Sequence, residues 1–328
     1  MDTVTLTPRR ARLAIGVVAQ FAFVAAVAAC SDDDRASAPL SRVTGPAPVS
    51  FAKGQDKGGS TTRRIAFIGQ FDKLSTMRPD GTDIVRLPGS NAAEDADPAW
   101  SPDYMKLTFV SNRGGGINNL HIANVDMTGL ENILPGHYVR NPSFSPDGTK
   151  IVFQNASISG AANWDIWVID LQTRNFVPLT TNPAADVDPH FSRDGSRIFF
   201  TSHRDGHPEV YSMNPDGTNQ TRMTFCGVAC FSAVVSPAGD RLAFSSTAFG
   251  NSILVTAPGD LLRYQAVTPA GQVANEFFHS PTWSPDGKKI AFEGIRNGSR
   301  GIWVANPDGS GLVNLTPGVI ATAPAWSW

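Results

Sequence analysis

Short apolar segments alternate with polar turn residues from about residue 63 onward. Five of these segments share the form apolar-x-Phe, at residues 107–109, 151–153, 198–200, 242–244 and 290–292. Uninterrupted apolar runs bounded by turn residues are typical of strands that are buried on both faces. The pattern therefore predicts an all-β protein with these strands in its interior.

A Trp/Phe-Ser-Pro-Asp-Gly-like turn precedes each apolar run and recurs along the chain. Its serines are Ser101, Ser145, Ser192, Ser236, Ser284 and Ser327, which gives spacings of 44, 47, 44, 48 and 43. In such a turn Pro presets φ, Asp bonds to the backbone ahead of it, and Gly adopts a positive φ. A period in the forties with strand-like content predicts a β-propeller with one four-stranded blade per repeat.

The rest of each repeat supplies two more strands. A third run occurs at residues 165–169, 209–213 and 301–305, and an Asn-Pro-Asp-Gly turn follows it at 214–217 and 306–309. A fourth strand ends in threonine at positions 180, 224, 268 and 316. Each repeat is thus expected to be a four-stranded meander.

The two ends of the repeat region complement each other. Residues 64–67 resemble a second strand with no turn before them, and residues 324–328 resemble a first strand with nothing after it. Pairing of these segments would complete one more blade and leave no exposed sheet edge. We therefore predict a six-bladed propeller over residues 63–328 that is closed by its N- and C-terminal strands.

The first 62 residues have a different composition. A basic start, an apolar run over residues 13–26 and Val-Ala-Ala-Cys predict a lipoprotein signal at 1–29, with Cys30 as the first mature residue. A membrane-spanning helix is the competing reading, which the short run, Gln20 and the acidic residues 32–34 disfavour. Resemblance to bacterial lipoproteins implies acylation of Cys30 and export to the periplasm or cell surface. Residues 30–62, rich in Ser, Asp, Gly, Pro and Ala, are expected to be a flexible tether.

Charge and cysteine content narrow the function classes. The chain carries 27 basic and 29 acidic side chains, a formal net charge of −2, which gives no indication of a nucleic-acid surface. Besides Cys30, the cysteines are Cys226 and Cys230, for which we expect a disulfide because the protein is exported. A metal-binding or redox pair is the alternative, although the spacing is not C-x-x-C.

The loops on the two faces of the predicted ring differ in character. One face, the hairpin face, carries the repeated turns between first and second and between third and fourth strands, and we assign it no function. The other, the connection face, carries the links between second and third strands and between blades, which vary in length and chemistry. Candidate binding residues on the connection face are Asp97, Tyr138, Arg140, Asp188, His203, Arg204, His207, Phe278 and His279.

Most of these candidates also have a structural interpretation. Asp97 and Asp188 precede prolines at the start of the innermost strand, where they could hold a cation or, as we favour, satisfy local backbone N–H groups. His203 and His207 stand four apart in a loop, which is weak evidence for a metal site. The segment 277–279 could be an exposed anchor for a partner or a loop folded inward. We predict neither a metal nor a cofactor.

The repeat [DS]-P-x-[WF]-S-x-D-G-x-x-[IL]-x-F, at residues 188–200, 280–292 and, with Tyr104 in place of Gly, 97–109, resembles the TolB-type propeller repeat. This resemblance covers residues 63–328. It implies a periplasmic propeller of the Tol–Pal envelope system that binds an outer-membrane lipoprotein. Residues 31–60 do not resemble the α/β domain that precedes the propeller in that family, and TolB is not lipidated.

Two hypotheses of function follow. The first is a lipid-anchored, monomeric, non-catalytic propeller that binds an envelope protein or envelope component through its connection face. The second is an enzyme or small-ligand binder at the channel mouth that acts on a saccharide or peptide, with or without a metal. The same repeat precedes peptidase domains of the prolyl oligopeptidase type, but this sequence contains no G-x-S-x-G motif. Convergence of two histidines with Asp97 or Asp188 would favour the second hypothesis.

Overall fold

The computed structural model describes residues 63–327, except 71, 89–93, 114–115, 157–162, 248–249, 258–259 and 270–275. The predicted signal, Cys30 and the predicted tether lie outside the described residues. No helix in the described part of the chain has the length and apolar content needed to cross a membrane.

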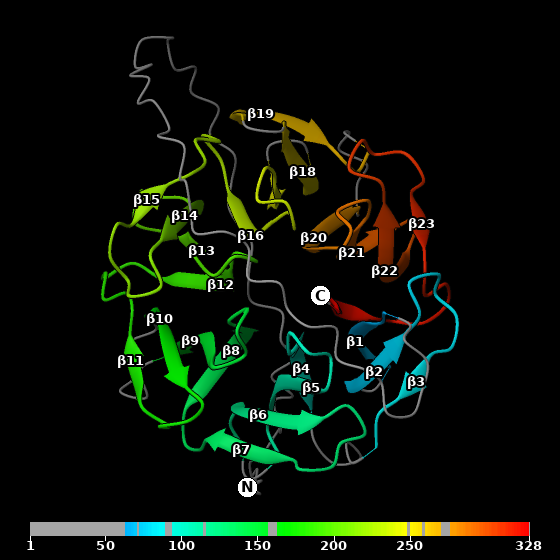
Figure 1. Ribbon diagram of the computed structural model, residues 1–328. Coiled ribbons are helices and arrows are strands. Elements are labelled where there is room, and N and C mark those ends of the chain that lie inside the picture. The colour runs from blue at the N-terminus through cyan, green and yellow to red at the C-terminus, as the bar shows by residue number, and fades with distance from the viewer. Residues whose placement is uncertain are drawn as a thin grey trace, which may run out of the picture. The chain divides into compact units, whose positions relative to one another are not determined.

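The described residues form six four-stranded antiparallel sheets arranged as a ring (Figure 1). Blade 1 consists of β24 (Thr322–Trp326), β1 (Ile65–Gly69), β2 (Lys73–Met77) and β3 (Val85–Arg86). Blade 2 consists of β4 (Asp95–Trp100), β5 (Lys106–Ser111), β6 (Asn119–Asn124) and β7 (Glu131–Leu134). Blade 3 consists of β8 (Tyr138–Phe144), β9 (Lys150–Ala156), β10 (Trp164–Asp170) and β11 (Phe176–Pro178). Blade 4 consists of β12 (Asp186–Phe191), β13 (Ile198–Ser202), β14 (Glu209–Met213) and β15 (Thr221–Arg222). Blade 5 consists of β16 (Cys230–Val235), β17 (Leu242–Ser246), β18 (Ser252–Ala257) and β19 (Asp260–Ala266). Blade 6 consists of β20 (Phe277–Trp283), β21 (Ile290–Arg296), β22 (Ser299–Ala305) and β23 (Val313–Asn314). The six-bladed all-β prediction is confirmed.

Blade 1 is built from both ends of the propeller. β24, red in Figure 1, pairs antiparallel with β1, blue, through Ile65 opposite Trp326 and Ala66 opposite Ala325. Just before β1, the Arg64 N–H donates to Ser327 Oγ at 2.9 Å, and the Ser327 N–H donates to the Arg64 carbonyl at 2.9 Å. The ring therefore closes by pairing of distant strands, as the truncated repeats predict.

The core lies between blades rather than within one of them. Six hydrophobic clusters in the described residues each join two neighbouring blades, and the last of the six joins blade 6 to blade 1. The motif aromatics are at most 7% exposed, and the phenylalanines that end the apolar-x-Phe runs are fully buried. The apolar runs are therefore buried on both faces because every blade is covered by two neighbours.

The repeated Ser-Pro-Asp-Gly turn is held by its own side chains. In blade 3, Ser145 Oγ donates to Asp147 Oδ1 at 2.6 Å and accepts the Lys150 N–H at 2.9 Å. Asp147 Oδ1 also accepts the Thr149 N–H at 3.0 Å. The motif thus recurs because it closes the hairpin between first and second strands in the five blades that are continuous in sequence.

Candidate functional site at the channel mouth

Each innermost strand contains one residue with a left-handed backbone at its connection-face end. These residues are Asp97 (φ 49°), Asn141 (48°), Asp188 (54°), Ser232 (52°), Ser280 (54°) and Ala323 (49°). The pairing register shifts at this point in all six blades, which identifies a β-bulge. Proline follows the bulge residue in five of the blades and has no N–H to leave unpaired.

The bulges connect neighbouring blades through hydrogen bonds. In five of them the backbone N–H donates to a side-chain oxygen of the preceding blade, and in four of these five the oxygen belongs to a second strand. These four pairs are Asp188 to Gln154 (2.8 Å), Ser232 to Thr201 (3.0 Å), Ser280 to Ser245 (3.2 Å) and Ala323 to Glu293 (3.1 Å). Polar residues in otherwise apolar second strands are therefore explained as acceptors for the next blade's bulge.

The polar side chains of blades 2 to 5 form one continuous network at the channel mouth. Asp97 Oδ2 accepts Arg140 Nε at 2.6 Å and the Asn141 N–H at 3.1 Å. The Asn141 side-chain amide donates to Asp188, whose second oxygen accepts Ser232 Oγ at 2.6 Å. The two aspartates therefore bridge neighbouring blades, instead of bonding to backbone N–H groups within their own turns.

The charges in this network perturb one another. Burial raises the pKa of Asp188, and the charge of Asp97 raises it further, against the lowering effects of Ser232 and Arg140. The Asp97 carboxylate raises the pKa of Arg140, so Arg140 stays charged. Burial lowers the pKa of His203, although the charges of Asp188 and Asp186 act in the opposite direction. The mouth thus combines two carboxylates and one guanidinium in a partly buried setting.

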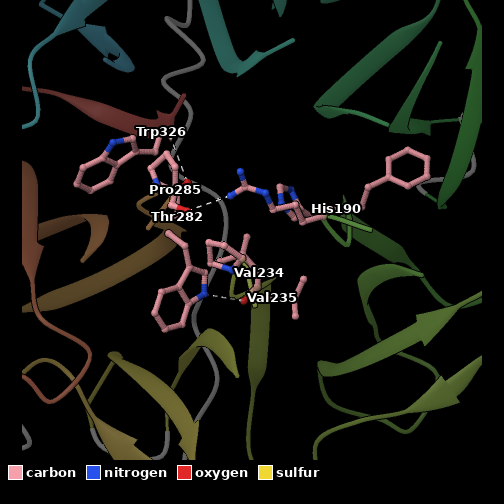
Figure 2. Close-up of a pocket in the computed structure, with 10 residues that line it drawn as sticks. His190, Val234, Val235, Thr282, Pro285 and Trp326 are labelled. Atoms are coloured by element: carbon pink, nitrogen blue, oxygen red, sulfur yellow. Dashed lines mark hydrogen bonds between the residues drawn. The ribbon is translucent and has the colours of Figure 1, made fainter. Parts of the chain in front are cut away.

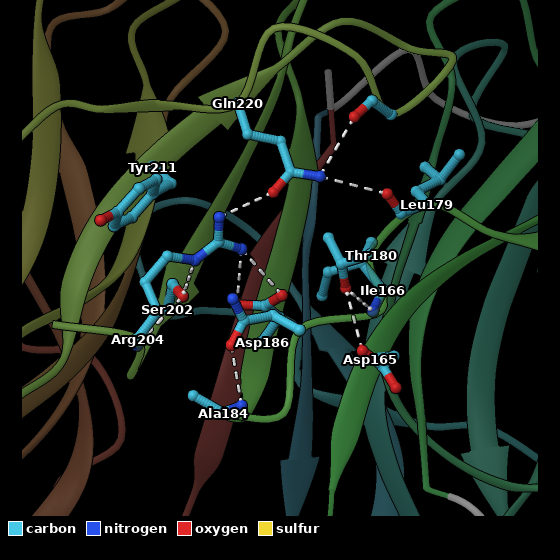
Figure 3. Close-up of polar contacts among 12 residues, drawn as sticks. Asp165, Ile166, Leu179, Thr180, Ala184, Asp186, Ser202, Arg204, Tyr211 and Gln220 are labelled. Atoms are coloured by element: carbon cyan, nitrogen blue, oxygen red, sulfur yellow. Dashed lines mark hydrogen bonds and ion pairs between the residues drawn. The ribbon is translucent and has the colours of Figure 1, made fainter. Parts of the chain in front are cut away.

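Arg204 belongs to a separate structural cluster (Figure 3). Its Nη2 lies 3.0 and 3.2 Å from the two oxygens of Asp186, which is fully buried, and its Nε donates to Ser202 Oγ at 2.7 Å. Its Nη1 donates to Gln220 at 2.8 Å, and its guanidinium lies over the Tyr211 ring at 4.7 Å.

Blade 2 repeats the same construction with a second arginine. Arg113 contacts Asp95 at 2.6 Å and Ser111 at 2.9 Å, and lies over the Phe109 ring at 5.0 Å. This repetition indicates that Arg204 stabilises its blade and does not serve as a ligand-binding residue.

The other candidates are dispersed around the connection face. Tyr138 is 38% exposed and packs against Trp164, with ring centroids 5.2 Å apart. His207 Nε2 lies 3.0 Å from Glu209, and His279 Nε2 lies 3.5 Å from Glu293. The candidates thus divide into one connected group, containing Asp97, Arg140 and Asp188, and several separate positions.

Phe278 is not available as a surface anchor. Its side chain is 3% exposed and packs edge-on against Phe292 and Trp303 in the core between blades 5 and 6. Of the two interpretations of segment 277–279, the inward one therefore applies to this side chain. The alternation of β20 explains the difference, since Phe278 and its neighbours Phe277 and His279 point to opposite faces.

The hairpin-face side of the channel holds a small pocket of about 60 Å³ (Figure 2). Its lining includes His190, Val234 and Trp326. Arg193 also lines it and reaches from blade 4 to blade 6, where its Nη1 donates to the Pro285 carbonyl at 3.0 Å. Burial lowers the pKa of His190 to about 4, so this imidazole is neutral at pH 7.

Sequence reasoning missed Asn141, Ser232 and Arg193. Asn141 and Ser232 occupy the same repeat position as Asp97 and Asp188, so aligning the repeats on the bulge would have found them. Arg193 replaces the proline of the Ser-Pro-Asp-Gly turn, and that departure is the signal for its contact across the channel.

Taken together, the ring of meanders, the strand-paired closure and the bulge at each innermost strand define a closed six-bladed β-propeller with a polar channel mouth. The chain belongs to the TolB β-propeller (PD40) family, whose model matches residues 98–328.

Similar proteins agree with this family. Tol-Pal system protein TolB of Francisella tularensis subsp. holarctica is 27% identical over 243 residues, which cover 71% of this chain and 54% of that protein. An uncharacterized protein of Agrobacterium fabrum, Atu1656, is 28% identical over 45% of this chain and 52% of its own length. The chain thus spans about half the length of these curated relatives.

Solved structures show the same fold. TolB from Acinetobacter baumannii superposes with a TM-score of 0.69 at 23% identity, over 81% of this chain and 66% of that one. A manganese complex of oligogalacturonate lyase superposes with a TM-score of 0.55 at 16% identity, over 77% of this chain and 74% of that one. At such identities the likeness establishes the fold and no activity.

Proposed function

We propose that this protein is a non-catalytic propeller of the cell envelope that binds an envelope protein through its connection face. The TolB relative named above is a Tol-Pal system protein, and the match with it covers 71% of this chain. Membership of the same family supports a protein-binding role in the envelope. That the partner of this chain is an envelope protein is itself part of the proposal.

The observation that carries the proposal is the chemistry of the connection face. Exposed apolar side chains project from it at several blades around the polar channel mouth. They are Ile117, Tyr138, Phe225, Val228 and Ile320. Exposed aromatic and aliphatic side chains around a polar, rigid scaffold are the composition expected of a protein-binding surface. The hairpin face also exposes apolar side chains, namely Ile84, Tyr104, Met105 and Leu130, so the two faces differ mainly in their polar groups: those of the repeated hairpin turns are bonded within the turn itself.

Convergence of two histidines with Asp97 or Asp188 would favour the enzyme hypothesis. In the described part of the chain, neither aspartate belongs to a group of three or more His, Cys, Asp or Glu side chains close enough to share a metal ion. The network around Asp188 is closed by Asn141 and Ser232 instead. We therefore favour binding over catalysis.

We further propose that acylation of Cys30 anchors the propeller to a membrane, with residues 30–62 as the tether. The motif Val-Ala-Ala-Cys after an apolar run supports this part of the proposal. Several acyl chains on one cysteine would hold the protein stably, because each buried CH₂ contributes about 0.8 kcal/mol.

Site-specific photocrosslinking in the native envelope tests the proposal. A photoreactive residue is placed at Tyr138, His207 or Phe225 on the connection face, and at Asp308 in a hairpin-face turn as the matched control. We expect one dominant protein to be captured from the first three positions and not from Asp308. In a parallel arm, Cys30→Ser is expected to abolish metabolic labelling with palmitate and to release the protein from membranes.

Equal capture from both faces, or no capture from the connection face, would contradict the binding proposal. For a captured partner, Phe225→Ala should weaken binding of the purified pair by at least about fivefold, because truncation of an aromatic hot-spot residue costs more than about 1 kcal/mol. Palmitate labelling that persists in Cys30→Ser would contradict the anchor alone and leave the binding proposal standing.

A further inference from the structure

One arginine departs from the repeated turn of the hairpin face. The residue after the motif serine is proline in four blades, at positions 102, 146, 237 and 285, but it is Arg193 in blade 4. Proline presets the backbone of such a turn, and arginine does not. The turn itself thus gives no reason for an arginine at this position, and the side chain is the feature to explain.

The positive charge of Arg193 lacks a counter-charge in the described part of the chain. The described residues give its guanidinium one hydrogen bond, from Nη1 to the neutral Pro285 carbonyl of blade 6 at 3.0 Å, and no carboxylate partner. A guanidinium has five N–H donors, and a carboxylate can accept two of them in parallel. The bond to Pro285 also holds the side chain in place, so an anionic ligand would lose little affinity to ordering of Arg193.

Arg193 lies between two adjoining hollows at the hairpin-face end of the channel. Arg193, Pro237, Trp283 and Pro285 line both of them. The inner pocket is the one of about 60 Å³ described above. The outer hollow has about 410 Å³ and lies between the first turns of blades 4, 5 and 6. One ligand can therefore extend from the outer hollow past Arg193 into the inner pocket.

The walls of the inner pocket are mainly apolar. Figure 2 shows Val234, Val235 and Trp326 around it, from blades 5 and 1. His190 also lines it, and burial lowers the pKa of this imidazole to about 4, so it is neutral at pH 7. Because no carboxylate occurs among its described lining residues, the inner pocket carries the positive charge of Arg193 alone.

The outer hollow has balanced charge instead. Asp240 and Asp286 line it together with Arg193 and Arg241. Both carboxylates accept hydrogen bonds from the motif serines of their own turns, at 2.8 and 2.7 Å. Complementary charge therefore places an anionic group at the inner end, beside Arg193, whereas the outer hollow suits a neutral polar chain.

We propose that this site binds the C-terminal end of a peptide whose last residue has a small apolar side chain. The carboxylate pairs with Arg193, the last side chain enters the inner pocket, and the preceding backbone lies in the outer hollow. The inner volume of about 60 Å³ is about twice the share of one water molecule in the liquid, which fits a side chain of about two or three carbon atoms. The outer hollow is several times larger, so a short free acid would leave most of the site empty.

Titration calorimetry on the full chain tests the site with a matched pair of peptides. One is an acetylated tetrapeptide that ends in valine with a free carboxylate, and the other is its C-terminal amide. We expect the free acid to bind at least about fivefold more tightly than the amide, because hydrogen bonds between charged groups are the stronger ones. A peptide that ends in tryptophan should bind more weakly than the valine peptide, since an indole exceeds the inner pocket. Butyrate should also bind more weakly, because it leaves the outer hollow empty.

Arg193→Pro is the matched variant, because it restores the residue of four other blades and is expected to stay folded, which circular dichroism checks. It should lose the preference for the free acid over the amide, as should Arg193→Gln. Lys106→Gln removes an exposed charge at the corresponding turn of blade 2 and should bind both peptides like wild type. Equal affinity of wild type for acid and amide, an unchanged preference in both Arg193 variants, or butyrate binding as tightly as the valine peptide would overturn the proposal. None of these results bears on the proposed binding of an envelope protein at the connection face.

Discussion

At the residue scale, two aspartates of the same blade experience opposite environments. Burial raises the pKa of Asp188 in the channel network. Asp216 lies in the exposed turn after β14, where the Thr218 hydroxyl and then the Thr218 N–H lower its pKa. Ionisation of Asp188 therefore lowers the stability of the folded state, whereas ionisation of Asp216 stabilises its turn.

This contrast predicts opposite pH dependence for two matched variants. A folded-state pKa above the unfolded value means that the folded protein binds the proton more tightly, so wild type gains stability relative to Asp188→Asn as pH falls through the raised pKa of Asp188. For Asp216 the folded pKa is depressed, so wild type loses stability relative to Asp216→Asn as pH falls from the unfolded pKa through the folded one. Urea unfolding of the three proteins between pH 7 and the start of acid unfolding measures both differences. Parallel slopes for the two variants would contradict the assigned environments.

The sequence predicted the face of the channel residues but not their partners. Asp97 and Asp188 could be placed because each precedes a proline at the start of an innermost strand. Their bonds to Asn141 and Ser232 could not, because these partners lie 44 or more residues away on other blades. Side-chain direction at these positions also depends on the left-handed bulge, which no propensity of Asp, Asn or Ser specifies uniquely.

At the scale of the element, the turn between third and fourth strands also contacts the neighbouring blade. Gly217 in the Asn-Pro-Asp-Gly turn of blade 4 has φ 84°, and a Cβ there would meet the Leu179 carbonyl oxygen of blade 3 at 2.7 Å. Gly81 and Gly309 face the end of the preceding blade in the same way. Sequence reasoning identified the turn from its residues, whereas this packing contact became apparent only with the blades in place.

Gly217→Ala should consequently destabilise the protein more than a comparable change elsewhere. A left-handed alanine costs about 1–2 kcal/mol, and the clash with backbone at Leu179 adds to that cost. Gly206→Ala is the matched control, because φ is 89° and no atom lies within 4 Å of the added Cβ. Thermal or urea unfolding of both variants gives the comparison. Equal losses of stability would mean that the turn does not press on the neighbouring blade.

At the scale of the whole molecule, closure joins a strand from one end of the propeller to three strands from the other. The truncated repeats predicted this pairing, because residues 64–67 lack a first strand and residues 324–328 supply one. The structure adds that the closing strand also contacts its neighbours: Trp100 Nε1 of blade 2 donates to the Ala325 carbonyl at 3.1 Å. Trp326 packs into the cluster between blades 6 and 1.

Closure makes Trp326 different from its equivalent, Trp283, although both side chains are 7% exposed. Removing either large core side chain should cost about 3–5 kcal/mol of unfolding free energy. Only at Trp326, however, does the destabilised strand lack a covalent link to the strand beside it, so β24 can detach while the rest of the ring stays folded.

Hydrogen exchange distinguishes the two tryptophans. Trp326→Ala should accelerate amide exchange in β1 and β24 well above the rest of the protein, whereas Trp283→Ala should accelerate exchange through global unfolding alone. Val313→Ala, at a side chain 51% exposed on an outermost strand, is the control and should change stability by no more than about 0.5 kcal/mol. If amides of β1 exchange no faster in Trp326→Ala than in Trp283→Ala, the closing strand opens only when the whole ring unfolds. Blade 1 is then as cooperative as a blade whose four strands are consecutive in the chain.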